Sequence, residues 1–231
     1  MRLLAIPASG LLATGSFFYY TRHVEAVHLS PSDSIFQSKY HQRFNPNNNP
    51  TVHDLHVRVV PISQIDPALL ERQDALIERY SAGVWAGAGF AIQRMLAHLG
   101  KQESASHQLW TRSELLESKY NPGTVITDEF IVLDKAKHSI LIRGGDKVSK
   151  TGPRPLDGLI ELSVQLKPED DCVQFRFKSL FFQGDVRTDK MPMPAPVIWL
   201  HEQYAKALLE SGVRHVIQSE NKGAFTEMDQ S

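Results

Sequence analysis

The sequence contains one cysteine, Cys172, among 231 residues. A single thiol excludes an internal disulfide framework and any zinc or iron–sulfur site built from several cysteines. An excess of charge of either sign is missing too, because 25 basic and 26 acidic residues are interspersed and leave a formal net charge of -1. Nucleic-acid-binding chains carry a basic patch or run, so we expect no nucleic-acid partner.

Motifs that would fix a chemistry are also absent from the sequence. No G-x-S-x-G pattern supplies a serine nucleophile. Gly87 and Gly89 lack the third glycine of a dinucleotide fingerprint, and no strand is expected before them. His201-Glu202 lacks the second histidine of H-E-x-x-H. The sequence therefore predicts neither a metal nor a cofactor.

The composition is that of a globular protein, with 42% hydrophobic and 22% charged residues. Such a chain is long enough to bury a full core in one domain. We divide it into an N-terminal hydrophobic anchor or targeting segment (residues 1–26), a Ser-, Asn- and Pro-rich linker or surface loop (27–51), a single α+β domain (52–218) and a polar tail (219–231).

Residues 3–20, LLAIPASGLLATGSFFYY, carry no charge and are flanked by Arg2 and Arg22. Eighteen such residues are just enough to span a bilayer, and the aromatic residues 17–20 stand where a membrane interface would lie. A cleaved signal or a transit sequence is the alternative, and the absence of acidic residues before Glu25 also fits a mitochondrial presequence. Because no small-x-small cleavage site follows the run, we favour a single-pass membrane anchor over removal or burial in the core. Mitochondrial and endoplasmic reticulum membranes are not distinguished.

The first half of the domain is predicted to contain one strand and several helices. Residues 53–62 alternate as a strand that ends at Pro61. Asp66 followed by Pro67 predicts an N-cap and a helix to about residue 80, and a second helix covers 81–100. The glycines of that second helix would let another backbone approach closely, and we interpret it as a buried core helix. A short helix is expected over residues 110–120.

From residue 124 onward the hydrophobic pattern has a period of two. It predicts four strands, and their short connections favour an antiparallel meander. A helix with an apolar stripe follows at residues 197–217 and must bury that stripe. The simplest α+β arrangement folds the sheet around this C-terminal helix. The four predicted strands are residues 124–134, 138–146, 159–167 and 172–182.

The chain resembles the START-like and polyketide-cyclase-like superfamily. The resemblance lies in this order of elements, in the alternation of residues 160–166 and in the helix VIWLHEQYAKALL. In that helix-grip architecture a curved antiparallel sheet surrounds a long C-terminal helix over a hydrophobic pocket. The resemblance covers roughly residues 124–217, with 53–62 as a first strand. Members commonly bind lipids, sterols or polyketide-like molecules, and some are cyclases or hydrolases. The resemblance implies a hydrophobic ligand as partner, although a fold alone does not establish a function.

The candidate site residues follow from where they lie in these elements. His201 is expected to face the sheet and is the best general base. Either Asp128 or its neighbour Glu129 faces the inside of its strand, and the pattern does not decide which. Arg143 is a candidate for an anionic group, with a loop ion pair as the alternative. The sequence also leaves open whether bulky side chains fill the space or line a cavity. The predicted catalytic residues are His201, Asp128 and Glu161, and the predicted ligand-binding residues are Val164, Phe175, Phe177, Arg143 and Tyr204.

Three functional hypotheses remain at this point. The first is a membrane-anchored protein that binds a hydrophobic small molecule or lipid between the sheet and the C-terminal helix. The second is a cyclase- or isomerase-type enzyme for an apolar substrate. The third is an assembly protein whose glycine-rich helix packs on a membrane partner.

Overall fold

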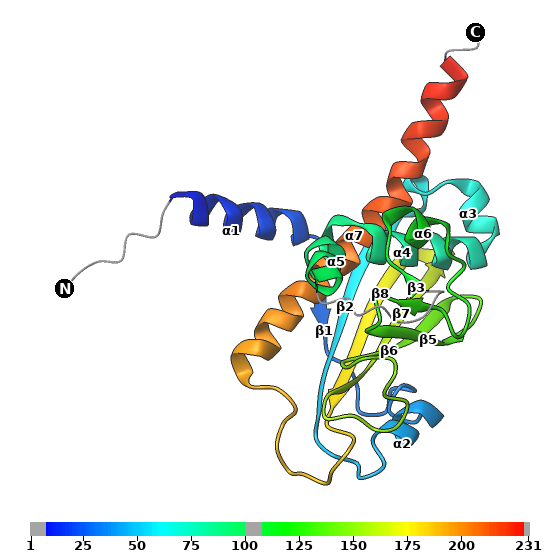
Figure 1. Ribbon diagram of the computed structural model, residues 1–231. Coiled ribbons are helices and arrows are strands. Elements are labelled where there is room, and N and C mark those ends of the chain that lie inside the picture. Colours follow the sequence, from blue (N-terminus) through cyan, green and yellow to red (C-terminus); the bar gives the residue numbers. More distant parts are fainter. Residues whose placement is uncertain (1–7, 100–107, 229–231) are drawn as a thin grey trace.

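The computed structural model describes residues 8–99 and 108–228, and its centre is a curved sheet with a long helix across one face (Figure 1). The sheet has eight strands in the order β1-β2-β8-β7-β6-β5-β4-β3. The strands are β1 (Glu25–Val27), β2 (Thr51–Pro61), β3 (Gln108–Leu109), β4 (Val125–Ile126), β5 (Phe130–Lys135), β6 (Ser139–Gly144), β7 (Asp157–Lys167) and β8 (Cys172–Phe182).

The predicted antiparallel meander is confirmed for β5 to β8. β2, the first predicted strand, returns to the far edge of β8 and pairs with it along its whole length, from Thr51 opposite Phe182 to Pro61 opposite Cys172. The sheet is mixed rather than purely antiparallel, because β3 runs parallel to β4. An α+β fold with this large sheet and a long C-terminal helix is compatible with a helix-grip arrangement.

The strand expected over residues 124–134 is instead two strands, β4 and β5. Thr127 and Asp128 adopt positive φ angles of 50° and 61°, which reverse the chain between Ile126 and Phe130. The β-branched Thr127 is rarely found in this conformation, and no glycine marks the turn. The prediction of one continuous strand was therefore wrong, and the side chains of Asp128 and Glu129 no longer alternate as strand neighbours.

The helices are α1 (Ala8–Thr21), α2 (Lys39–Phe44), α3 (Pro67–Glu71), α4 (Gln73–Ala86), α5 (Ala88–Leu99), α6 (Arg112–Glu117) and α7 (Ala195–Met228). Asp66 caps α3 as predicted, with its carboxylate accepting from the backbone N–H of Ala68. Thr111 and Glu114 form a capping box at α6. The division between the two long helices was misplaced, because it falls at the extended Gly87 and not near residue 80. α7 continues to Met228, so much of the expected polar tail is helical.

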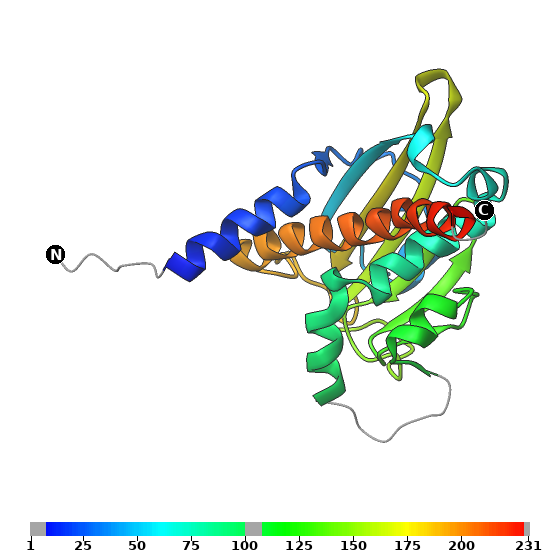
Figure 2. The same ribbon diagram turned by 90° about the horizontal axis from the view of Figure 1, so that it is seen from above.

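The glycines of α4 and α5 bring these helices against α7. A Cβ at Gly83 would lie 2.8 Å from the Cα of Gly212, and one at Gly89 would lie 2.8 Å from the carbonyl oxygen of Ala207. The close backbone approach that the sequence predicted is thus made within the protein, and its partner is α7. Figure 2 shows α7 crossing over the sheet with α4 beside it.

The inner face of the sheet is only partly filled by side chains. Towards the β7–β8 turn, Tyr80 of α4 is fully buried and packs edge-on against Phe175 at 5.2 Å between ring centroids. Leu162 and Val164 of β7 belong to the same core cluster. This half of the space between the sheet and α7 is therefore a packed core, and any cavity lies at the other half.

The segment from residue 27 to 51, expected as a linker or surface loop, packs on the outer face of the sheet. Leu29, Ile35 and Phe44 are buried there against Leu159 and Phe182. Tyr40 donates its hydroxyl proton to the carbonyl of Leu133 at 2.9 Å. The outer face is thus a second small core, built by residues that precede β2.

Helix α1 leaves the body of the protein and projects away from the sheet (Figures 1 and 2). Its end is held on α7, where the guanidinium of Arg214 stacks over the Tyr20 ring at 4.4 Å. Part of the predicted anchor, residues 1–7, lies outside the described residues. Among the residues that the structure describes, no helix is long and apolar enough to cross a membrane.

Candidate functional site

A cavity of about 490 Å³ lies between the sheet and the first half of α7. Its size is within the usual range of small-molecule sites. Apolar side chains make most of its wall, and polar groups converge on it from α5, α7, the β4–β5 turn and the β6–β7 loop. The lining residues are Trp85, Gln93, Glu129, Phe130, Gly145, Asp146, Lys147, Ile160, Phe177, Phe181, His201, Tyr204 and Leu208.

His201 joins α7 to the sheet at this cavity. Its Nε2 atom lies 3.0 Å from Oδ2 of Asp54 on β2 and 3.0 Å from Oγ of Ser179 on β8. The hydroxyl of Ser179 also donates to Asp54 at 2.8 Å. Because Ser179 and Asp54 share the same ring nitrogen, the three residues do not form a nucleophilic triad, which requires the two ring nitrogens to have different partners.

The charge of Asp54 decides the tautomer of His201. Burial raises the pKa of Asp54, but its contacts with His201, at 3.0 Å, and His56, at 3.3 Å, outweigh burial and hold this pKa well below its usual range. Asp54 is therefore an anion that favours the tautomer of His201 with its proton on Nε2. Nδ1 of His201 has no hydrogen-bond partner within the described part of the chain, so in the neutral ring it is an acceptor beside the cavity.

The opposite wall carries a second polar chain. Tyr204 of α7 donates its hydroxyl proton to Oε1 of Gln93 at 2.8 Å, and Nε2 of Gln93 donates to Glu129 at 2.9 Å. Burial and the charge of Glu129 raise the pKa of Tyr204, so its phenol stays protonated. The cavity thus has the imidazole of His201 on one wall and, on another, a hydrogen-bond chain that ends at the Glu129 carboxylate.

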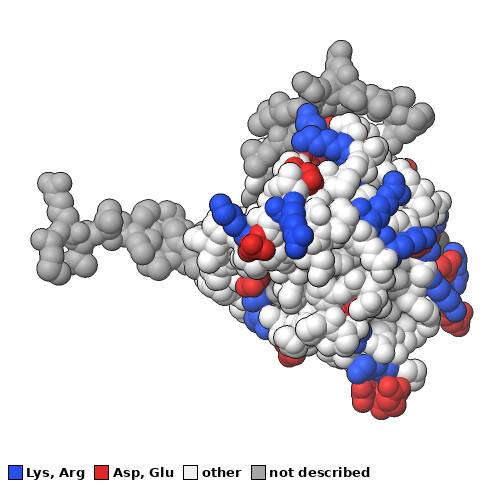
Figure 3. Space-filling model, turned by 90° about the horizontal axis from the view of Figure 1, so that it is seen from below, with Lys and Arg blue, Asp and Glu red and all other residues white. Residues whose placement is uncertain are grey.

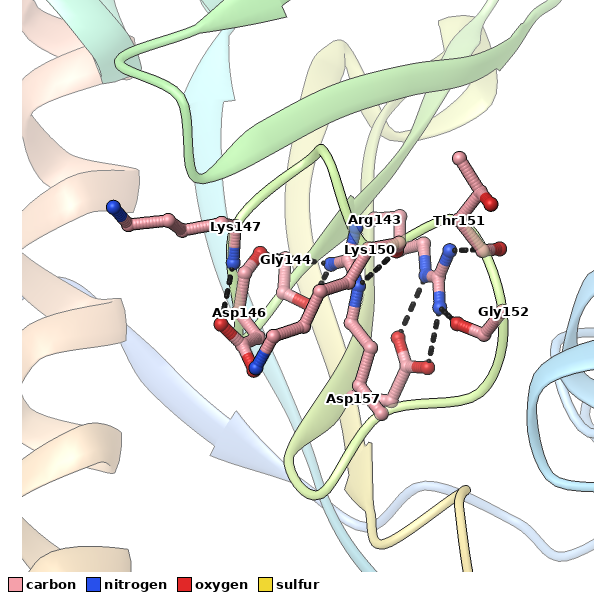
Figure 4. Close-up of polar contacts among 9 residues, drawn as sticks. Arg143, Gly144, Asp146, Lys147, Lys150, Thr151, Gly152 and Asp157 are labelled. Carbon is pink, nitrogen blue, oxygen red and sulfur yellow. Dashed lines mark hydrogen bonds and ion pairs between the residues drawn. The ribbon is translucent and has the colours of Figure 1, made fainter. Parts of the chain in front are cut away.

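The β6–β7 loop at the mouth of the cavity is held by two buried arginines. Arg143 makes a bidentate ion pair with Asp157, at 2.8 and 2.6 Å, and donates to the carbonyls of Thr151 and Gly152 (Figure 4). Arg154 is fully buried and donates to three carbonyls of the same loop. Of the alternatives for Arg143, the structure shows the loop ion pair, because its guanidinium donors already have protein partners.

The clamped loop brings a lysine to the cavity. Lys147 extends from the loop towards α7 in Figure 4 and belongs to the cavity lining. Asp146 lies beside it and pairs with Lys150 at 2.5 Å. With Glu129 and His201 on the other walls, the lining holds charges of both signs.

The predicted site residues are divided among five places. His201, Phe177 and Tyr204 line the cavity together. Asp128 lies in the β4–β5 turn outside the cavity lining, where it accepts from Gln108 at 3.3 Å. Glu161 lies on the outer face and pairs with Lys178 at 3.0 Å, so it does not meet His201. Val164 and Phe175 lie in the packed core, and Arg143 clamps the loop.

Asp54 and Ser179 are among the contributors to the site that were missed from the sequence, whereas of Asp128 and Glu129, which the pattern left open, Glu129 lines the cavity. The signal for Asp54 was its position two residues before His56, which places both on one face of β2. That face is the inner one, as the contact of Asp54 with His201 shows, whereas the ring of His53 packs on Phe36 at 5.3 Å on the other side. A carboxylate on a strand face is not a signal by itself, because most are solvated.

Charged side chains and potential metal ligands also occur outside the cavity. On the face seen in Figure 3, lysine, arginine and acidic side chains lie interspersed without a broad area of one sign. No group of three or more potential metal ligands occurs among the residues that the structure describes. No family model, curated protein or solved structure matches the chain.

Proposed function

We propose that this protein binds a small, largely apolar molecule with an uncharged polar end in the cavity between the sheet and α7. The observation that carries the proposal is the cavity itself, about 490 Å³ of mostly apolar wall that also includes His201 and Tyr204. Membership of the START-like superfamily is part of the same proposal, supported by the order of elements and the position of the cavity.

Native mass spectrometry of the full-length protein tests this function. The protein is purified gently, and its mass is compared before and after denaturation. A molecule present at one copy per chain and released only on denaturation is the expected result, and its fragmentation identifies its chemistry. A folded protein that carries nothing and takes up no long-chain alcohol, sterol or ketone contradicts the proposal.

The His201–Asp54 pair favours a second candidate, a cyclase- or isomerase-type enzyme. With Nε2–H directed to the Asp54 anion, Nδ1 is placed to remove a proton from a bound substrate. Incubating the loaded protein in D2O tests this chemistry. An enzyme exchanges a ligand C–H for deuterium, and His201→Gln abolishes the exchange while the ligand stays bound. Retention of every C–H in the wild type leaves binding as the function.

We also propose that the protein works at a membrane, attached through its N-terminal segment. Exposed apolar side chains support this, since Phe18 and Tyr19 of α1, Ile92 and Met95 of α5 and Leu200 of α7 are each more than half exposed. An anchored chain stays in the membrane pellet after alkaline carbonate extraction. A chain attached only through its surface is released, and recovery in the soluble fraction without extraction contradicts the proposal. The assembly hypothesis gains no support, because the glycines of α4 and α5 already pack on α7.

A further inference from the structure

A second hollow lies outside the cavity, between α1, α5 and α7. It has a volume of about 710 Å³. None of its lining side chains is charged, and Ile92 within it is 68% exposed. An apolar concave surface of this kind usually has an occupant. The residues that line it are Ser16, Phe17, Tyr20, Ala88, Gly89, Ile92, Gln93, Tyr204 and Ala207.

This groove and the inner cavity share a wall. Gln93 and Tyr204 line both the groove and the cavity. The 2.8 Å hydrogen bond between these two side chains is part of the shared wall. His201 lies three residues before Tyr204 on α7, so their Cβ atoms are about 5–6 Å apart on one helix face. A ligand whose polar end meets His201 therefore has the groove within reach of its other end.

We propose that the groove between α1, α5 and α7 binds the hydrocarbon chain of the same ligand whose polar end lies at His201. This inference rests on the proposed function. The class of ligand it specifies is an uncharged amphiphile with one hydrogen-bonding end group and a long chain, such as a fatty alcohol or a long-chain ketone.

The charges of the two spaces support a single amphiphile over a protein partner. The inner cavity offers charges of both signs and hydrogen-bonding groups, whereas the groove offers no charged group at all. A protein segment in the groove would bring backbone N–H and C=O groups that need partners, and the lining contains few polar atoms to satisfy them. A hydrocarbon chain has no such requirement.

A series of straight-chain primary alcohols, from hexanol to hexadecanol, tests the inference with the full-length protein by calorimetry. In the wild type we expect the affinity to rise by about fourfold for each methylene that is buried, and to go on rising for the long members. Ala88→Phe places a ring in the groove from an exposed position at the start of α5. In this variant the affinity for hexanol is expected to stay unchanged, while the rise with chain length stops early.

Ala68→Phe is the matched control, because Ala68 is also exposed in the first turn of a helix but lies outside both hollows. It should follow the wild-type series. If Ala88→Phe shows the same chain-length dependence as the wild type, the chain does not enter the groove and the inference is overturned while the cavity proposal stands. If no alcohol of any length binds the wild type, both proposals fail.

Light scattering tests a second copy of the chain as the occupant of the groove. If the wild type is a dimer that Ala88→Phe dissociates, and the alcohol series is unchanged, the occupant is a second copy.

Discussion

Nε2 of His201 lies 3.0 Å from Oδ2 of Asp54, and this contact joins α7 to the inner face of β2. It fixes the orientation of the imidazole, because the carboxylate holds one ring nitrogen and leaves the other beside the cavity. The same contact contributes to stability, since the side chain of Asp54 is only 9% exposed and its ionised form depends on its partners.

We expect Asp54→Asn to lower the free energy of unfolding by about 2 kcal/mol near neutral pH, because the amide carries no charge and replaces one acceptor oxygen by an NH2 group that only donates. The pKa of Asp54 is depressed in the folded state, so its stabilisation is complete above the ordinary value of about 3.9. It is lost as the pH falls towards the lower folded pKa. Urea denaturation of both proteins from neutral to acidic pH measures this difference. A difference that stays constant down to about pH 2 contradicts the assignment.

Substitutions at two positions on the inner face of β7 distinguish the cavity from the packed core. Ile160 lines the cavity, whereas Val164 belongs to the core and not to the cavity lining, and each side chain is 3% exposed. We expect Ile160→Phe to block ligand uptake at little cost in stability, because the ring has open space to enter. Val164→Phe should instead cost about 1–3 kcal/mol through overpacking. Native mass spectrometry and thermal unfolding of both variants measure these effects, and the opposite assignment of the two would place the cavity elsewhere.

The Arg143–Asp157 ion pair is expected to stabilise the loop that carries Lys147. Asp157 is fully buried, so Arg143→Ala leaves an unpaired charge and should cost about 3–5 kcal/mol in unfolding free energy. The double variant Arg143→Met with Asp157→Leu removes both charges and should recover much of that loss. Denaturant unfolding of the single and double variants gives the coupling between them. Strictly additive losses would show that the two residues stabilise the protein independently.

The α4–α7 contact predicts a strong effect of a single methyl group. Gly83→Ala places a Cβ against the side chain of His215 and within 2.8 Å of Gly212, and we expect a loss of about 1–3 kcal/mol. Gly15→Ala is the matched helical control, because nothing lies within 4 Å of a Cβ at that position. It should be neutral or slightly stabilising, since alanine favours helices by about 1 kcal/mol over glycine. Equal unfolding midpoints for the two variants would show that α4 and α7 separate easily.

Local patterns in the sequence predicted the elements whose signals are themselves local. Residues 172–182 were expected as a strand and form β8 with the same bounds, and Asp66 was identified as a cap. In contrast, the turn at Thr127 was missed, because positive φ angles there occur at residues that do not favour them. That turn is imposed by the pairing of β4 with β5.

The sequence by itself determined that this is an α+β chain with a period-two sheet, a long C-terminal helix, balanced charge and no motif for covalent or metal chemistry. Only the tertiary structure decided which face of β2 looks inward, that Asp54 and Ser179 meet His201, and that Tyr80 fills one half of the space under α7 while the other half is open. The physical reason is that periodicity reports the environment along one element. The convergence of side chains far apart in the sequence, and the volume left between them, depend on how all the elements pack together.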